Sequence, residues 1–139
     1  MPHRILMVDD ERDLVFATKL YLEAEDYEVL AAYDGHQALE VLGAVEELPD
    51  LVILDVFMPR MSGWDVLRMI RASERTQSLP VIMLTAAGQD ADKARGWDLG
   101  VDWYQTKPFD PKDLLVVIER VLQVAQQQAQ EDDLLGEEG

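Results

Sequence analysis

Five short apolar runs alternate along this chain with longer segments of helical periodicity. The runs are Ile5–Val8, Glu28–Ala32, Leu51–Leu54, Val81–Leu84 and Trp103–Thr106. Three of them are apolar almost without interruption, which is typical of strands buried on both faces of a sheet. Strands that alternate with helices form a parallel sheet through right-handed crossovers, with helices on both faces. We therefore predict an α/β fold: a three-layer, doubly wound (βα)5 domain with a five-stranded parallel sheet.

The segments between the runs carry apolar residues three and four positions apart, as amphipathic helices do. Ser62 and Asp110 are suited to cap the third and last helices, and Pro111 suits a first helical position. The fourth segment, residues 90–99, is the weakest, because Gly96 interrupts it and its apolar face is thin. The apolar faces predicted for the other four helices comprise Val15, Thr18 and Leu22; Leu39, Leu42 and Val45; Val66, Leu67 and Ile70; and Leu114, Ile118, Val121 and Ala125.

The chain is long enough for one domain with a substantial core, which we place at residues 4–123. Past Ala125 the sequence becomes rich in glutamine and then in acidic residues. We predict that residues 124–139 are a helix extension, an acidic Gln-rich tail or a linker stub. The last helix should continue one or two turns into this segment before it frays.

Composition restricts the partners of the chain. Its net charge of −16 argues against nonspecific binding to nucleic acid or to an anionic membrane surface. The chain has no cysteine, and no stretch approaches the ~20 apolar residues that span a bilayer. We expect a cytoplasmic protein that binds neither nucleic acid nor membrane through this chain.

Polar side chains stand where four of the predicted strands end. Asp9 and Asp10 follow the first strand, Asp55 the third, Thr85 the fourth and Lys107 the fifth. Carboxyl ends of parallel strands meet at one edge, where two carboxylates about 4 Å apart would repel by roughly 4 kcal/mol. Such a cluster favours a cation, and hard oxygen donors suit Mg²⁺. Taken singly, the aspartates could instead be helix caps or turn residues, Thr85 a loop partner and Lys107 a solvated cation.

Four motifs resemble the receiver domain of two-component response regulators. The resemblance runs in the family's order and spacing from about Arg4 to Leu122 and implies the flavodoxin-like strand order 2-1-3-4-5. The motifs are Val8-Asp9-Asp10-Glu11, Leu54-Asp55-Val56-Phe57-Met58-Pro59 with Gly63, Met83-Leu84-Thr85-Ala86, and Tyr104-Gln105-Thr106-Lys107-Pro108-Phe109.

The resemblance implies a role for each of these residues. Asp55 matches the phosphoacceptor, and Asp9, Asp10, Asp55 and the backbone carbonyl of Phe57 match the Mg²⁺ ligands, with Asp9 acting mostly through water. Lys107 matches the lysine that pairs with a phosphate oxygen. It precedes Pro108, and the peptide bond between them resembles the family's cis bond.

The resemblance also implies a switch. Thr85 would move toward the phosphoryl group, and Tyr104 would turn inward to fill the vacated space, which would remodel the surface of the fourth helix, fifth strand and fifth helix. Phe57 and Ala87 stand where the family tunes dephosphorylation. Both are apolar, so we expect a slowly decaying phosphoaspartate. Trp103 replaces an acidic residue that many transcription-factor receivers use in dimer salt bridges.

Three function classes follow from these observations. The first is a receiver that takes its phosphoryl group from a sensor histidine kinase or a histidine phosphotransfer protein, and acts on a downstream protein, a C-terminal output domain or a phosphorylation-dependent homodimer. Such a receiver would catalyse only its own phosphorylation and dephosphorylation. The second is a Mg²⁺-dependent phosphatase of small substrates, which would typically need an aspartate as general acid where this chain has Phe57. The third is an interaction domain that is not phosphorylated.

Overall fold

The five strands of the protein form a single parallel sheet. The computed structural model describes residues 2–86 and 99–138. The strand order is β2-β1-β3-β4-β5, which confirms the predicted flavodoxin-like arrangement. The strands are β1 (Arg4–Val8), β2 (Glu28–Ala32), β3 (Leu51–Asp55), β4 (Val81–Ala86) and β5 (Trp103–Lys107).

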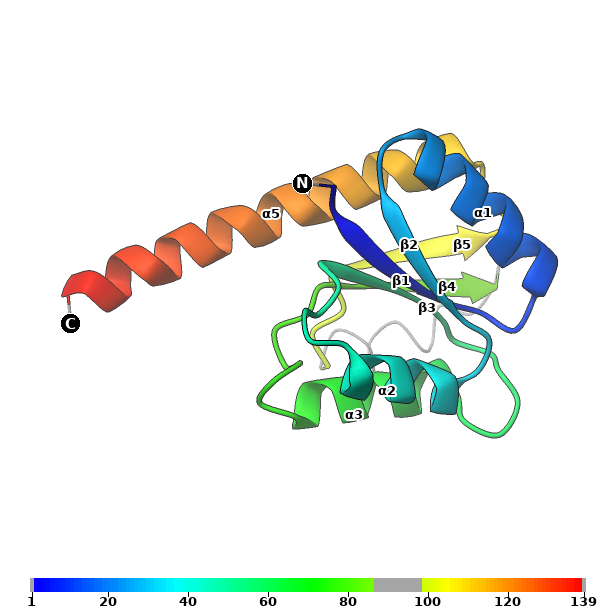
Figure 1. Ribbon diagram of the computed structural model, residues 1–139, viewed down its shortest axis with the longest axis horizontal. Helices are drawn as coiled ribbons and strands as arrows, with labels where there is room; N and C mark the ends of the chain where they lie inside the picture. Colours follow the sequence, from blue (N-terminus) through cyan, green and yellow to red (C-terminus); the bar gives the residue numbers. More distant parts are fainter. Residues whose placement is uncertain (1, 87–98, 139) are drawn as a thin grey trace.

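Helices cover both faces of this sheet, so the domain has three layers (Figure 1). Helices α1 (Arg12–Ala24) and α5 (Pro111–Glu138) pack on one face, and α2 (Gly35–Ala44) and α3 (Gly63–Ala72) pack on the other. The predicted helix at residues 90–99 lies outside the described residues except for Leu99.

Burial on both faces explains why the central strands are continuously apolar. In β1, Ile5 and Met7 join the core beneath α1 and α5, whereas Leu6 and Val8 join the core beneath α2 and α3. All four are fully buried. Successive side chains of a strand point to opposite faces, so a strand between two helical layers needs apolar residues at every position.

Local sequence sets several helix boundaries. Ser62 and Asp65 form a capping box at the start of α3, and the Asp110 side chain accepts a hydrogen bond of 2.9 Å from the backbone N–H of Lys112 at the start of α5. The predicted face of α2 is wrong in one respect. That helix ends at Ala44, so Val45, which has extended backbone, does not belong to its inner face. The buried residues of the helix are Gly35, Ala38 and Leu42.

Helix α5 is longer than the sequence predicts. It runs without interruption to Glu138, thirteen residues past Ala125, and projects beyond the sheet (Figure 1). Its glutamine, alanine, glutamate and leucine residues all favour helix. Among residues 2–86 and 99–138, no helix is both long enough and apolar enough to cross a membrane.

Candidate functional site

Strand register brings the polar residues to one edge of the sheet. In the pairing of β1 with β3, Val8 is opposite Leu54, so Asp9 and Asp55 follow these two residues at the same level. Asp55 is the last residue of β3, and Lys107 is the last residue of β5. The structure therefore unites the strand ends as the sequence predicts.

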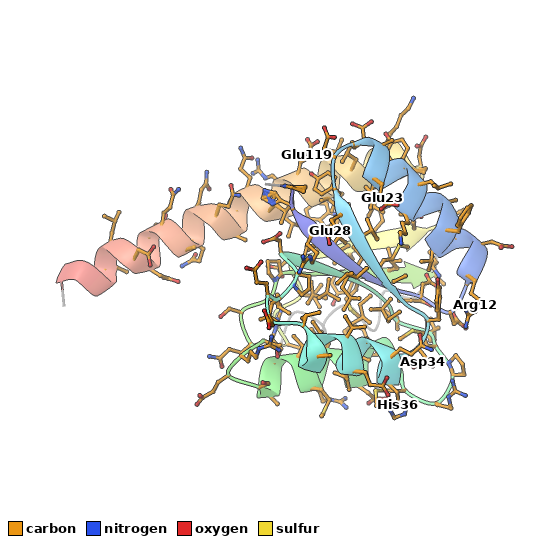
Figure 2. The ribbon with its side chains drawn as sticks, in the orientation of Figure 1. Arg12, Glu23, Glu28, Asp34, His36 and Glu119 are labelled. Atoms are coloured by element: carbon orange, nitrogen blue, oxygen red, sulfur yellow. The ribbon has the colours of Figure 1, made fainter. Side chains whose placement is uncertain are left out.

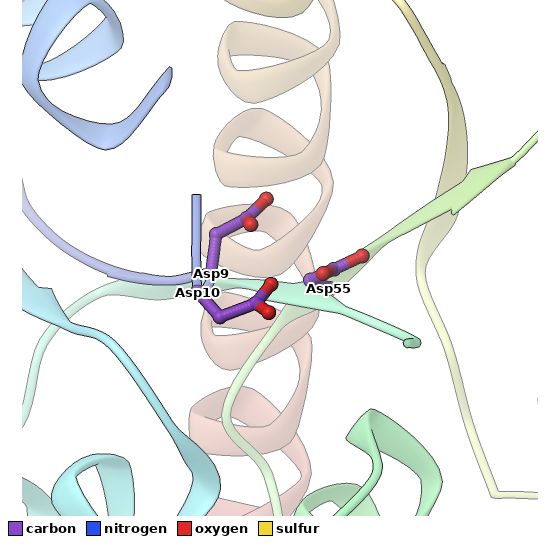
Figure 3. Close-up of side chains that lie close together, drawn as sticks. All are labelled: Asp9, Asp10 and Asp55. Carbon is purple, nitrogen blue, oxygen red and sulfur yellow. The ribbon is translucent and has the colours of Figure 1, made fainter. Parts of the chain in front are cut away.

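The three carboxylates form a tight cluster (Figure 3). One carboxylate oxygen from each of Asp9, Asp10 and Asp55 lies within 4.8 Å of the other two. Asp9 and Asp55 are buried, and Asp10 is exposed. Asp9 Oδ1 accepts a 3.0 Å hydrogen bond from the backbone N–H of Glu11, but the N-cap residue of α1 is Glu11 itself. Helix capping therefore does not account for the cluster.

Lys107 places a positive charge within the cluster. Its Nζ lies 2.7 Å from Asp9 Oδ2, 3.5 Å from Asp55 Oδ1 and 3.8 Å from Glu11 Oε2. The peptide bond between Lys107 and Pro108 is cis. One ammonium group thus bridges the ends of β1, β3 and β5, and Glu11 is a member of this group to which the sequence motifs assign no role.

The surroundings of Asp55 favour its neutral form. Burial of the carboxyl group and the negative charge of Asp9 raise the pKa of Asp55 to about 7, and Lys107 only partly offsets them. Lys107 shows the opposite balance. Burial lowers its pKa, but the hydrogen bond to Asp9 and the charges of Asp55, Asp9 and Glu11 outweigh burial, so its pKa is raised. A single lysine does not neutralise the cluster.

The donor set fits Mg²⁺. Three carboxylate oxygens close together satisfy its preference for hard oxygen ligands, and the exposure of Asp10 leaves the site open to the waters that Mg²⁺ retains.

Two arginines at this end of the domain are engaged with other partners: Arg12 stacks on the Tyr33 ring at 4.0 Å, and Arg60 pairs with Asp34 at 3.3 Å. Figure 2 shows Arg12 and Asp34 at this end of the domain, away from Glu119.

Thr85 and Tyr104 occupy neighbouring strands near the cluster. Thr85 is buried near the end of β4, directly opposite Thr106 of β5. Tyr104 is partly buried, and its ring lies 6.4 Å from that of Trp64, at 56°. No sequence pattern indicates this aromatic neighbour on α3. Ala87, the second predicted dephosphorylation-tuning position, lies outside the described residues.

Gly63 is required by close packing behind the phosphoacceptor position. A Cβ atom on this residue would lie 2.2 Å from the backbone carbonyl oxygen of Asp55. The Gly63 N–H donates a 2.9 Å hydrogen bond to the carbonyl of Val56. The start of α3 is therefore pressed against the end of β3, which only glycine permits.

A parallel α/β domain with an acidic cluster and a lysine at its carboxyl edge is consistent with a phosphoacceptor. The family model of the response regulator receiver domain matches residues 5–119, and the chain belongs to this family. This is a family of signalling phosphoacceptor domains.

Individual relatives agree with this assignment. The chain is 42% identical over 120 residues to the transcriptional regulatory protein CpxR of Escherichia coli, a match that covers 86% of this chain and 49% of that protein. It is 36% identical over 138 residues to the alkaline phosphatase synthesis transcriptional regulatory protein PhoP of Bacillus subtilis, covering 99% of this chain and 56% of that protein. The chain thus spans about half the length of these curated relatives.

A solved structure of a response regulator has a similar fold. A putative response regulator from Chloroflexus aurantiacus superposes with a TM-score of 0.81 at 34% sequence identity, covering 88% of this chain and 98% of that one. The shared fold therefore extends over most of this chain.

Proposed function

We propose that Asp55 accepts a phosphoryl group from a phosphohistidine of a sensor histidine kinase or histidine phosphotransfer protein. The observation that carries this proposal is the position of Lys107 Nζ, 3.5 Å from Asp55 Oδ1 and 2.7 Å from Asp9 Oδ2, beside a carboxylate cluster suited to a divalent cation. A nucleophilic carboxylate, a lysine and a metal site are the parts needed for phosphoryl transfer.

In the proposed step, a carboxylate oxygen of Asp55 attacks phosphorus. The bond between phosphorus and the donor's imidazole nitrogen breaks, and that nitrogen takes a proton from solvent. Asp9, Asp10, Asp55 and the backbone carbonyl of Phe57 would hold Mg²⁺, which when bound neutralises charge on the phosphoryl oxygens. Lys107 would move from its carboxylate partners to pair with one of those oxygens. Attack by water on the phosphoaspartate would later release inorganic phosphate.

The signal would then pass through Thr85 and Tyr104. The Thr85 hydroxyl would donate a hydrogen bond to a phosphoryl oxygen, and Tyr104 would turn inward. Burial of Thr85 at the site and the partly buried position of Tyr104 two strand residues before Thr106 support this coupling. Such a change biases two states of one surface, that of β5, α5 and the segment between β4 and β5.

The reader of that surface would be a downstream protein, an output domain attached to the receiver, or a second copy in a phosphorylation-dependent homodimer. The names of CpxR and PhoP describe transcriptional regulators, which supports an output on transcription. Trp103, which is 46% exposed on β5, offers an aromatic contact on the same surface.

A phosphatase of small substrates is the competing function. Such an enzyme would typically place a general acid two residues after its nucleophile, where this chain has Phe57, which is exposed and cannot donate a proton. The receiver function is therefore the better supported of the two.

The test is phosphorylation by acetyl phosphate with Mg²⁺, followed by intact mass measurement. The native chain should gain the mass of one phosphoryl group, and Asp55→Ala should gain none. Asp26→Asn is the matched control, because Asp26 has a positive φ of 70° that asparagine adopts readily, and this aspartate is not among the clustered carboxylates. Labelling of the Asp55→Ala chain equal to that of the native chain would remove Asp55 from its role. Transfer from a phosphorylated histidine kinase then tests the donor.

A further inference from the structure

The last part of α5 makes few contacts with the rest of the described domain. None of the α5 residues from Gln123 to Leu135 is buried, and the side chains from Gln126 to Leu135 are all exposed. Gln126 still reaches the His3 ring, with 3.5 Å between the two Nε2 atoms. Beyond it the helix projects into solvent (Figure 1). An unsupported helical segment of this length is marginal in water, so a partner would stabilise it.

One side of this projection carries large apolar side chains. Val124, Leu134 and Leu135 are 50%, 64% and 68% exposed. Val124, Gln127, Glu131 and Leu134 follow one another at spacings of three, four and three residues, so with Leu135 they line one side of the helix. We call these five residues the outer face.

The outer face is not the side by which α5 packs on its own domain. Ile118, Val121 and Leu122 of the same helix are buried in the core beneath α1 and α5. At 3.6 residues per turn, the outer face points well away from the direction of these three side chains. The packing of α5 on the sheet therefore leaves the outer face uncovered by the described residues.

We infer that the outer face is an interface with a second copy of this chain, in which the two α5 projections pair antiparallel. With the two-fold axis near residue 129, Leu134 and Leu135 of each copy lie opposite Val124 of the other. Gln127 of each copy lies opposite Glu131 of the other. Each copy thus presents the complement of its own pattern, as a two-fold interface requires.

Charge selects the antiparallel arrangement over the parallel one. Glu131, Asp132 and Asp133 are consecutive. A parallel pair would bring the two acidic triplets to the same level, and Glu131 would face Glu131 in a chain whose net charge is already −16. Like charges in adjacent positions are destabilising. An antiparallel pair instead sets each acidic triplet at the level of residues 125–127, which carry no charge and include amide donors.

This interface is separate from the sheet edge that holds Asp55. It uses residues 124–135, so it does not depend on the proposed phosphorylation. The absence of cysteine from the sequence makes the arrangement directly testable, because any disulfide must come from an introduced residue.

The first test is oxidative cross-linking of this chain in its intact, unphosphorylated form. A mixture of Gln127→Cys and Glu131→Cys chains should form a disulfide-linked heterodimer, and each variant alone should cross-link much less. Ala129→Cys is the matched control, since Ala129 is exposed and lies at the level of the two-fold axis but on the opposite side of the helix. Efficient cross-linking of the Gln127→Cys chain alone, or of the Glu131→Cys chain alone, would indicate parallel pairing and overturn the proposal. Cross-linking of Ala129→Cys as strong as that of the mixture would also overturn it, because no defined face would be used.

The second test is analytical ultracentrifugation across a range of concentrations. The native chain should show a monomer–dimer equilibrium, and Leu135→Gln should weaken dimerisation about tenfold, as loss of a buried leucine contact predicts. Ala129→Gln, on the opposite side, should leave the dissociation constant unchanged. A native chain that stays monomeric at every concentration, with its helix content intact by circular dichroism, would overturn the proposal.

Discussion

The ammonium nitrogen of Lys107 lies 2.7 Å from Asp9 Oδ2, closer than the 3.5 Å that separates it from Asp55 Oδ1. Asp9 is completely buried and the Lys107 side chain is 18% exposed, so this pair is partly shielded from water. The distances indicate that Lys107 is held by Asp9 before a phosphoryl group arrives. The lysine is therefore already placed beside Asp55, from where it would exchange its carboxylate partners for a phosphoryl oxygen.

Replacing Lys107 should slow phosphorylation. Lys107→Met removes the charge that faces Asp55, and loss of a comparable charge-stabilising group costs about a hundredfold in rate. The measurement is the initial rate of mass gain from acetyl phosphate at saturating Mg²⁺. Lys112→Met, at an exposed position on α5, serves as the control and should react at the native rate. A Lys107→Met chain that reacts as fast as the native chain would contradict the role given to this lysine.

The raised pKa of Asp55 predicts a pH-dependent stability. In the metal-free folded protein Asp55 keeps its proton up to about pH 7, whereas in the unfolded chain it loses it near its ordinary pKa of 3.8. The folded state therefore binds more protons between these values, and the stability contribution of Asp55 falls as pH rises through this window. Above about pH 7 the stability contribution of Asp55 has been lost and no longer changes with pH.

Asp55→Asn checks this prediction, because asparagine has the same shape and no charge. In EDTA, its melting temperature should exceed that of the native chain by an amount that grows from about pH 5 to about pH 7 and then levels off. Added Mg²⁺ should shrink the difference by stabilising ionised Asp55. A difference that stays constant between about pH 5 and about pH 8 would be incompatible with the raised pKa.

The fold was predicted well from the sequence because the central strands are buried on both faces of the sheet. Strands such as Leu51–Asp55 are buried at every position, and an uninterrupted apolar run ended by a carboxylate marks both the strand and its functional end. Asp9, Asp55 and Lys107 were found for the same reason. Parallel strands place their ends at one edge, so strand order alone unites residues that are far apart in the chain.

Other features depend on tertiary contacts that no short pattern encodes. Nothing in the sequence indicates that Lys107 lies nearer Asp9 than Asp55, or that burial raises the pKa of Asp55. The predicted inner face of α2 was partly wrong, because it included Val45, which lies past the end of the helix, and omitted Ala38, whose small side chain is a weak hydrophobic signal. Arg71, whose guanidinium group donates several hydrogen bonds to backbone carbonyls, was not identified from the sequence. These carbonyls are distant from Arg71 in the sequence, so no local pattern indicates the contacts.

Gly63→Ala should disturb the phosphoacceptor end of β3. The added methyl group would lie 2.2 Å from the Asp55 carbonyl oxygen, so backbone must shift. We expect a loss of about 1–3 kcal/mol in the free energy of unfolding, as overpacking typically costs, and a lower phosphorylation rate. Gly43→Ala is the control: nothing lies within 4 Å of its added Cβ, and alanine in a helix should stabilise by about 0.5–1 kcal/mol. Urea unfolding measures both, and equal effects of the two changes would argue against the close contact.

Arg71 connects α3 to the chain on either side of β4. Its guanidinium group donates hydrogen bonds to the carbonyls of Leu79 at 2.7 Å, Gly100 at 2.8 Å and Leu99 at 2.9 Å, and to that of Gln77 at 3.1 Å. We expect Arg71→Met to lower the free energy of unfolding by about 2–4 kcal/mol, because each such bond contributes about 0.5–1.5 kcal/mol.

Arg71→Lys should restore little of this stability, since one ammonium group cannot reproduce the fork of a guanidinium. Arg68→Met is the control, because Arg68 is exposed on the same helix and pairs with Asp65 at 3.2 Å across a single turn. Its removal should cost about 0.5 kcal/mol or less. Comparable losses for Arg68→Met and Arg71→Met in urea unfolding would contradict the connecting role.

The lifetime of the phosphoaspartate should depend on Phe57. This side chain is 52% exposed two residues after Asp55, and it has no polar group that could orient a water molecule for attack on phosphorus. We expect the phosphorylated native chain to persist well beyond seconds after acetyl phosphate is removed. Phe57→Gln, which introduces an amide at the same place, should shorten that lifetime severalfold because a positioned polar group assists the attacking water. Phe57→Leu, which stays apolar, should decay at the native rate. Intact mass measured over time distinguishes these outcomes, and a native half-life of seconds or less would show that water is positioned by other groups.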